Sequence, residues 1–392
     1  MQPSATLAMT AAAKTRKAAG HPVISLSAGE PDFNTPDAVS EAGISAIRKG
    51  QTKYTHNLGM PELREKIREK LLRENGLAYD ADNIICSNGA KQSVALAVSV
   101  LCCDGDEVII PAPYWVSYPE MVRFAGGKPV VVPTSVESDY LMSPDHLEDA
   151  ISDRTKIVIL CTPSNPTGSV YSREQLEGLA AVLRRYPDVF IISDEIYEHL
   201  VYDAEHVSFA SLDGMKDRTI TVNGFSKAFA MTGWRLGYLA ARPEIVKAAS
   251  KLQGQLTSAP STISQVAGIA ALDLDHSVIQ AMVTEFRKRR DFVVRSMQEI
   301  PGVLCPVPEG AFYVFPDIST YVGGTTDSGR TLLRSQDVCM YLLEEYDVAL
   351  VPGEAFGEPN GIRISYAASD NDLKVACERI HLAFSKITRV SN

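Results

Sequence analysis

Residues 84–101 read IICSNGAKQSVALAVSVL and join an apolar strand to an apolar helix through a polar turn. We expect the strand at 84–87, the turn at 88–92 and the helix at 93–101. Further strands are predicted at 107–110, 129–132, 157–160, 190–193, 220–222 and 236–240, with helices, such as one at 173–185, between several of them. Several of these strands are continuous apolar runs, as strands buried on both faces require. The pattern predicts an α/β fold with a large domain built on a mostly parallel sheet.

The flanking regions predict an arm and a smaller unit. Helices are expected at 9–19, 36–49 and 61–75, with a strand at 23–26, and a long helical region at 243–299 breaks near Pro260 and His276. From residue 302 onward, strands at 303–305, 311–316, 348–351 and 362–365 and helices at 335–345 and 370–385 predict an α+β unit, with 323–330 as a loop. The predicted domains are therefore 1–34, an arm with part of the small domain; 35–290, the large domain; and 291–392, the C-terminal small domain.

Composition narrows the class of protein. The chain has 392 residues, 45% of them hydrophobic, and a net charge of -10. The densest basic run, at 287–290, is typical of a solvated helix face, so a nucleic-acid partner is not expected. Seven scattered cysteines without metal-ligand spacing predict free thiols in a reducing cytosol, and no metal site. The first 20 residues lack the apolar core of a signal peptide, and the apolar runs are too short to span a bilayer. We expect a cytoplasmic protein with no membrane contact.

Lys227 lies in an unusual run of small and apolar residues, NGFSKAFAMTGWR at 223–235. Burial among such residues favours a neutral amine, and a neutral amine is a nucleophile that forms Schiff bases with aldehydes. The simpler alternative is that the stem of the side chain packs while its ammonium group reaches water. The neighbouring motifs decide between the two.

Loops at the carboxyl ends of parallel strands bind ligands in sheets of this kind. At 87–91, Gly89 precedes a helix whose free N–H groups could hold a phosphate, although glycine is common at helix starts. At 111–115, two prolines present Trp115, which could stack on a flat ring or pack in the core.

Two further loops carry polar groups at strand ends. Asn165 lies between two prolines that would fix its amide, or it belongs to an ordinary turn. Asp194 ends an apolar strand, where a buried charge needs a partner. Alternatively, Asp194 is a structural cap. Tyr197 follows three residues later. A carboxylate, a phenol, an amide, a stacking aromatic, a phosphate loop and a Schiff-base lysine together match pyridoxal phosphate.

The chain resembles the class I aminotransferases of fold type I, enzymes that use pyridoxal phosphate, over nearly its whole length. The motifs that carry the resemblance are SAGEPDF at 27–33, NPTG at 165–168, SDEIY at 193–197, SKAF at 226–229 and RISY at 363–366. It looks closest to the 1β aspartate aminotransferases, several of which also act on prephenate. The resemblance implies a large domain with a mostly parallel sheet flanked by helices, a smaller α+β domain, and a homodimer with shared active sites.

The resemblance also implies roles for the cofactor site. Lys227 would bind the cofactor covalently and then move the substrate's proton, and Asp194 would pair with the pyridine nitrogen. Trp115 would stack on the ring. The remaining implied cofactor contacts are Gly89, Ala90, Lys91, Asn165, Tyr197, Ser226, Arg235 and, from the neighbouring subunit, Tyr54.

For the substrate, the resemblance implies that Arg363 holds the α-carboxylate in its planar fork. The further implied substrate contacts are Gly29, Trp115 and Asn165, with Lys91 and Thr6 at the second carboxylate of a dicarboxylic acid. At Gln2 the chain departs from several prephenate-active relatives, which carry lysine there. We expect ping-pong transamination between aspartate and 2-oxoglutarate, with conversion of prephenate to arogenate as a further reaction.

Three other functions fit parts of the pattern. A cysteine-S-conjugate β-lyase or an aromatic aminotransferase would use the same Lys227 but would not need Lys91 for a second carboxylate. A dinucleotide-binding oxidoreductase also has an α/β pattern, but no G-x-G-x-x-G motif follows the first strand.

Overall fold

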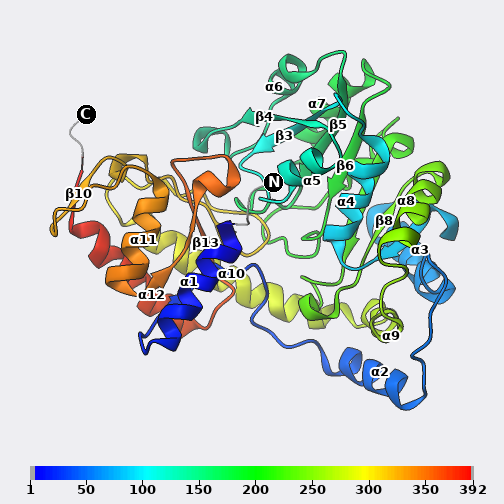
Figure 1. Ribbon diagram of the computed structural model, residues 1–392, viewed down its shortest axis with the longest axis horizontal. Coiled ribbons are helices and arrows are strands. Elements are labelled where there is room, and N and C mark those ends of the chain that lie inside the picture. Colours follow the sequence, from blue (N-terminus) through cyan, green and yellow to red (C-terminus); the bar gives the residue numbers. More distant parts are fainter. Residues whose placement is uncertain (1–4, 390–392) are drawn as a thin grey trace.

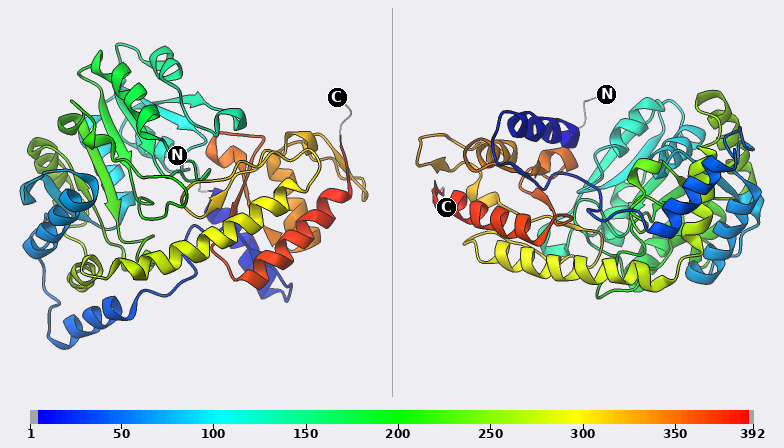
Figure 2. Two further views of the ribbon diagram at one scale, coloured as in Figure 1. Left: turned by 180° about the vertical axis from the view of Figure 1, so that it is seen from behind. Right: turned by 90° about the horizontal axis from the view of Figure 1, so that it is seen from below.

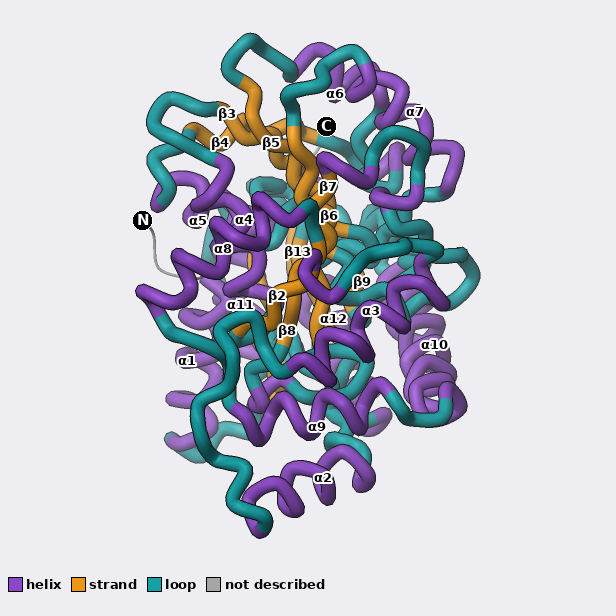
Figure 3. The backbone as a smooth tube through the Cα atoms, turned by 90° about the vertical axis from the view of Figure 1, so that its right-hand side faces the viewer, coloured by secondary structure: helices purple, strands orange, loops and turns teal. Residues whose placement is uncertain are grey.

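The computed structural model describes residues 5–389, arranged as a large sheet with its helices and a smaller unit beside it (Figure 1). Gln2 lies outside the described residues. Figure 3 shows the strands at the centre of the molecule and the helices around them.

The large sheet has seven strands in the order β2-β8-β7-β6-β5-β3-β4. In this sheet only β8 runs antiparallel to its neighbours, β2 and β7; the other pairs are parallel. The mostly parallel α/β fold is therefore confirmed. The strand bounds are β2 Ile84–Ser87, β3 Glu107–Ala112, β4 Lys128–Pro133, β5 Thr155–Cys161, β6 Phe190–Asp194, β7 Thr219–Gly224 and β8 Gly237–Ala240.

Helices cover both faces of this sheet because its strands are apolar on both sides. Along β5, Ile157 and Ile159 pack into one core with α4, α5 and α8, while Val158 and Leu160 pack into another with α7. Successive side chains of a strand point to opposite faces, and each fully buried one contributes about 1.5–3 kcal/mol. The helix bounds are α3 Pro61–Asn75, α4 Ala90–Leu101, α5 Tyr118–Phe124, α6 Pro144–Ala150, α7 Arg173–Arg184, α8 Pro243–Leu256, α9 Thr262–Leu272 and α10 His276–Gln298.

Local sequence signals account for several helix ends. Pro61 occupies the first turn of α3, where its missing N–H costs nothing, and Gly76 ends that helix with a φ of 68°. At the start of α7, the Ser172 hydroxyl accepts from the Gln175 N–H, and the Gln175 side chain accepts from the Ser172 N–H. This reciprocal pair is a capping box.

The smaller unit combines the arm with the C-terminal part of the chain. Its β1 pairs with β11, β12-β13-β9 form a three-stranded antiparallel sheet, and β10 pairs with β14. Helix α1 contacts β11 and β12, which places the arm beside this unit. The bounds are α1 Ala5–Ala18, β1 Ile24–Ser25, β9 Tyr313–Val314, β10 Thr325–Thr326, α11 Ser335–Tyr346, β11 Val348–Ala349, β12 Val351–Pro352, β13 Ile362–Ser365, α12 Asp370–Ser385 and β14 Ile387–Thr388. Helix α2, Asp37–Arg48, follows the arm and packs on α9 of the large part (Figure 1).

Four element predictions are corrected. The strand expected at 303–305 is absent: Leu304 makes only an isolated bridge with Asp317. The loop expected at 323–330 contains the short strand β10. Helices α1 and α4 each begin three or four residues before the predicted start, at Ala5 and Ala90.

Helix α10 connects the two parts of the molecule, and Figure 2 shows it extending from the large sheet to the smaller unit. The predicted domain boundary at residue 290 falls inside this helix. In residues 5–389 no single helix has the length and apolar character needed to span a membrane. Helices α9 and α10 have that length and apolar character only when they are taken together, and a bend of 88° separates them.

Candidate active site

A cavity of about 400 Å³ opens where β5, β6 and β7 end at their carboxyl edges and the arm helix α1 lies opposite. Cys161 and Asp194 end two of those strands, and Ser226 follows the third. This edge is where open parallel sheets bind ligands. Of the predicted site residues, the cavity is lined by Thr6, Gly29, Ala90, Lys91, Trp115, Asn165, Asp194, Tyr197, Ser226, Lys227, Arg235 and Arg363.

The Lys227 side chain points into this cavity, and its amine donates a hydrogen bond to the carbonyl of Gly29. Its nitrogen lies 5.6 Å from the ring centre of Tyr197 and 5.7 Å from that of Phe312. Burial, with the charge of Arg363 next, lowers the pKa of Lys227 to about 8. At pH 7 about a tenth of the amine is therefore neutral, far more than in an ordinary lysine, and the neutral amine is the form that a nucleophile or base requires.

Asp194 is a buried carboxylate at the end of β6, 4% exposed. The Tyr118 hydroxyl donates to its Oδ2 at 2.6 Å, and the Ile196 N–H donates to its Oδ1 at 3.3 Å. Burial raises the pKa of Asp194 to about 6 although these hydrogen bonds oppose the rise. No ion pair reaches this carboxylate from the described part of the chain, so it is suited to a cationic ligand group.

Arg363 is a buried guanidinium on β13 that also lacks an anionic partner among residues 5–389. One of its terminal nitrogens donates to Oδ1 of Asn165 at 2.9 Å and the other to the Ser27 carbonyl at 2.6 Å, while Nε has no partner. The guanidinium carbon lies 4.6 Å from the Tyr313 ring centre and 5.1 Å from that of Phe356. Neutral groups thus hold a full positive charge in place, which is what recognition of a carboxylate needs.

A second cationic corner lies at the N-terminus of α4. Gly89 has a φ of 88°, and a Cβ there would stand 2.5 Å from Arg235 Nη2, so a glycine is required for Arg235 to approach. Arg235 donates to the carbonyls of Asn88 at 3.1 Å and Thr232 at 2.8 Å. Free N–H groups of the helix start and one guanidinium together form an anion site.

Lys91 lies across the cavity from the sheet, at the first turn of α4. Its nitrogen is 5.0 Å from the ring centre of Trp115. Burial, and then the charge of Arg235, lowers the pKa of Lys91. Thr6 contributes to the same wall from α1. This side of the cavity therefore offers a second cation to a ligand held at Arg363.

Sequence reasoning missed three residues that shape the site. Tyr118 bonds Asp194, Tyr313 bonds Tyr197 through their hydroxyls at 2.8 Å, and Gly237 leaves room for the start of α4 because a Cβ there would meet the Ala90 nitrogen at 2.4 Å. The signal for Tyr118 was its place three residues after Trp115. No local pattern marks the other two, whose roles depend on the pairing of distant strands.

Two predicted residues are not part of this cavity's lining: Gly89, which directly precedes Ala90, and Tyr54. The side chain of Tyr54 is 98% exposed, and its predicted role concerns the site of a neighbouring subunit.

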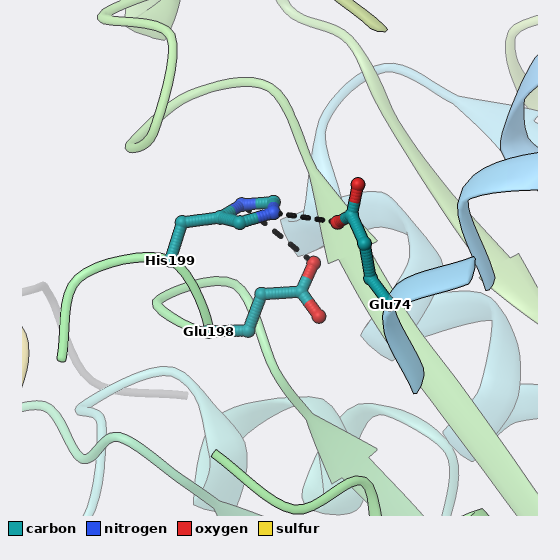
Figure 4. A group of neighbouring side chains, drawn as sticks. All are labelled: Glu74, Glu198 and His199. Carbon is teal, nitrogen blue, oxygen red and sulfur yellow. Dashed lines mark hydrogen bonds and ion pairs between the residues drawn. The ribbon is translucent and has the colours of Figure 1, made fainter. Parts of the chain in front are cut away.

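A second polar cluster lies behind the site, between α3 and the turn after β6 (Figure 4). His199 Nε2 is 2.8 Å from Glu74 Oε2, and His199 Nδ1 is 3.8 Å from Glu198 Oε1. These groups have the composition of a metal site, but the ammonium of Lys70, 2% exposed, bonds Glu198 and donates to Asn75 Oδ1 at 2.8 Å. Lysine thus supplies the cation of this cluster.

The cluster connects elements that carry the site. The Asn223 amide on β7 donates to Glu198 Oε1 at 2.6 Å, three residues before Ser226. Burial opposes the ionisation of Glu198, but Lys70 and His199 hold its pKa well below its usual range. The charged Glu198 therefore fastens the turn that bears Tyr197 to α3 and β7.

Comparison with known proteins identifies the family. The family model for class I and II aminotransferases matches residues 21–380. The chain belongs to this family. It is 54% identical to the bifunctional aspartate aminotransferase and glutamate/aspartate-prephenate aminotransferase of Petunia hybrida, over 99% of this chain and 82% of the relative.

Two solved structures are similar over nearly the whole aminotransferase chain. The aspartate aminotransferase of Rhizobium meliloti is 46% identical, with a TM-score of 0.96 over 99% of this chain and 98% of that one. The aspartate aminotransferase of Thermus thermophilus with maleate is 41% identical, with a TM-score of 0.92 over 98% of this chain and 97% of that one. The predicted family and fold are thereby confirmed.

Proposed function

We propose that this aminotransferase passes the amino group between aspartate and 2-oxoglutarate, and that it also converts prephenate to arogenate with aspartate or glutamate as donor. The observation that carries the proposal is the buried guanidinium of Arg363, which has no anionic partner among residues 5–389 and lines the same cavity as Lys227 and the cation of Lys91. Aspartate, glutamate and prephenate each carry two carboxylates, which this pair of cations suits. The names of the relatives support the same assignment.

The residues fit pyridoxal phosphate as the cofactor. Asp194 is a buried carboxylate without a cation of its own, as a partner for a protonated pyridine nitrogen should be. Arg235 and the start of α4 suit a phosphate, Trp115 offers a flat face, and Lys227 offers a neutral amine. When bound, this cofactor supplies an electron sink for the bonds at the substrate's α-carbon.

The chain's own groups then divide the work. Arg363 binds the α-carboxylate in two parallel hydrogen bonds and orients the substrate, with the free amide nitrogen of Asn165 beside it. Lys227, as a neutral amine, would accept the proton from the substrate's α-carbon and return it to C4′ of the cofactor, on the other side of the amino nitrogen. Tyr197 would donate a hydrogen bond to the cofactor's ring oxygen, and Asp194 would keep the ring nitrogen protonated.

The second carboxylate determines which substrates bind well. Lys91 attracts it, and the Thr6 hydroxyl on α1 gives it a hydrogen bond. Because the Lys91 side chain also lies over Trp115, it reaches the cavity from a fixed direction.

We further propose a cytoplasmic homodimer with shared sites. Tyr54, 98% exposed, is free to reach the phosphate corner of a second copy. The seven cysteines are all unpaired, which suits a reducing compartment. The division into an arm (1–34), a large domain (35–290) and a small domain (291–392) remains a proposal.

The test is a transamination assay with prephenate and either aspartate or glutamate as donor, beside aspartate with 2-oxoglutarate. We expect turnover in all three. If oxaloacetate and 2-oxoglutarate are accepted as amino acceptors but prephenate is not, the enzyme is an aspartate aminotransferase without prephenate activity.

A matched variant separates the proposal from a lyase or an aromatic aminotransferase. Lys91→Met keeps the length of the side chain but removes its charge, so kcat/KM for aspartate should fall by about 10–100-fold, a loss of roughly 1.4–3 kcal/mol. The rate with a neutral amino acid such as alanine should change little. Equal losses for both substrates would contradict the role of Lys91.

A further inference from the structure

Tyr313 links the two halves of the cavity. It lies on β9, whose register pairs it with Ser365 on β13. Alternate residues of a strand share a face, so Tyr313 lies on the same face as Arg363, two residues before Ser365. Its ring lies 4.6 Å from the guanidinium carbon, and its hydroxyl oxygen lies 2.8 Å from that of Tyr197.

The hydroxyl of Tyr313 has one hydrogen-bond partner within residues 5–389, the hydroxyl of Tyr197. Both side chains are buried. A Cβ at Gly29 would stand 3.0 Å from this hydroxyl, so the glycine leaves just enough room for the phenol. The pair is thus enclosed and away from bulk water.

The direction of the bond follows from counting protons. A phenol has one proton to donate and lone pairs to accept. If Tyr197 gives its proton to a ligand in the cavity, it has none left for Tyr313, and Tyr313 must be the donor. A phenol that accepts a hydrogen bond donates its own proton more strongly, because hydrogen bonds in a chain polarise one another.

We propose that Tyr313 is a positioning residue that acts on the cofactor through Tyr197: its hydroxyl donates to Tyr197 and so directs the Tyr197 proton to the cofactor's ring oxygen. This inference rests on the proposed function, since it requires pyridoxal phosphate in the cavity. The contact between the Tyr313 ring and Arg363, in contrast, does not depend on the Tyr313 hydroxyl.

The consequence can be read in the absorbance of the bound cofactor. A hydrogen bond to a negatively charged oxygen favours the deprotonated form and lowers the pH at which the chromophore titrates. Removing the Tyr313 hydroxyl weakens that bond, so the midpoint moves upward. The contact with Arg363 persists, so binding of a dicarboxylate should not change.

The experiment uses the holoenzyme and four variants: Tyr313→Phe, Tyr197→Phe, the double variant, and Tyr321→Phe as a control. Tyr321 is another buried tyrosine, but its hydroxyl bonds the Pro301 carbonyl, remote from the cavity. For each we measure the pH midpoint of the cofactor absorbance and the Kd of maleate. Circular dichroism and the Tm check that each variant folds.

We expect Tyr313→Phe to raise the midpoint by about 0.3 pH unit or more, with the Kd of maleate within about twofold of the wild type. Tyr197→Phe should raise the midpoint by about one unit. The double variant should match Tyr197→Phe alone, because one residue acts through the other. Tyr321→Phe should leave both quantities unchanged.

Three results would overturn the inference while leaving the proposed function intact. They are an unchanged midpoint in Tyr313→Phe, additive shifts in the double variant, and a shift of equal size in Tyr321→Phe. A wild-type protein that shows no absorbance of bound pyridoxal phosphate would instead overturn the proposed function itself.

Discussion

At the scale of single residues, Lys227 and Asp194 show how burial prepares a site. The same loss of water lowers the pKa of the amine to about 8 and raises that of the carboxyl to about 6. Both shifts disfavour charge, so each group is ready for a partner that the described chain does not itself provide.

The lowered pKa of Lys227 gives a prediction for the cofactor-free protein. A depressed pKa means that the reactive neutral amine appears as the pH rises through about 8 rather than through about 10.5, the ordinary value. Labelling by an amine-directed reagent, followed by mass spectrometry of the Lys227 peptide, should therefore show a midpoint near pH 8. A midpoint near pH 10.5, the ordinary value for lysine, would contradict the account.

Tyr118 gives a second prediction at this scale. Its hydrogen bond stabilises the charged form of Asp194, so Tyr118→Phe should raise the pKa of Asp194 further above about 6. Less of the carboxylate is then ionised at neutral pH, and we expect the affinity for pyridoxal phosphate to fall by about tenfold, or 1.4 kcal/mol. Fluorescence titrations at pH 6 to 8 measure it; an unchanged Kd would contradict the role of Tyr118.

At the scale of elements, the polar cluster between α3 and the turn after β6 determines where Tyr197 and Ser226 sit. Glu198 accepts from Lys70 on α3 and from Asn223 on β7, and it follows Tyr197 directly in the chain. Tyr197 thus lines the cavity, while the next residue, Glu198, fastens the same turn to α3 and β7.

Breaking this cluster should be costly. Lys70→Met leaves Glu198 buried without its cation, and we expect the free energy of unfolding to fall by about 3–5 kcal/mol. Lys66→Met is the matched control on the same helix, since Lys66 pairs with Asp273 at the surface and should matter little. Denaturant unfolding measures the free energy of unfolding of both variants. Equal values would mean that the buried Lys70–Glu198 pair contributes no more to stability than the surface pair of Lys66 and Asp273.

The elements also show what the sequence predicts and what it does not. The seven strands of the large sheet were found because burial on both faces leaves a continuous apolar signal, as in Ile157 to Leu160. The two-residue strands β10 and β14 were missed because so short a run carries no period. The expected strand at 303–305 is apolar but finds no continuous partner, and Leu304 makes one bridge only.

The same contrast holds for the candidate site. Asn165, Asp194 and Lys227 follow strands of the sheet, so the motifs themselves place them at one edge. Tyr313 enters from the other part of the molecule, through the register of β9 with β13. Such a contact between residues 116 positions apart leaves no local trace in the chain.

At the scale of the whole molecule, the cavity lies between the large sheet and the smaller unit. Lys227 and Asp194 come from the first, and Arg363 and Thr6 come from β13 and the arm. In the proposed mechanism, a substrate bound at Arg363 would thereby be presented to Lys227 across the division between the two parts.

The proposed dimer with shared sites leads to a complementation test. In the proposed dimer, each site takes Lys227 from one subunit and Tyr54 from the other. A heterodimer of the Lys227→Ala and Tyr54→Ala variants would therefore contain one site with both residues intact and one site that lacks both. Unfolding and refolding the variants together at limiting pyridoxal phosphate should therefore restore activity, up to about a quarter of the wild-type level from random pairing. Activity no higher than the average of the separate variants would argue against a shared site.

The most direct test of the central claim is the rate of transamination between aspartate and 2-oxoglutarate in the wild type and in Lys227→Ala, with Lys251→Ala as the surface control. If Lys227 moves the substrate's proton, its loss should lower kcat by at least about a thousandfold and abolish the absorbance of covalently bound cofactor, while Lys251→Ala behaves as the wild type. Retention of either turnover or that absorbance by Lys227→Ala would contradict the assignment.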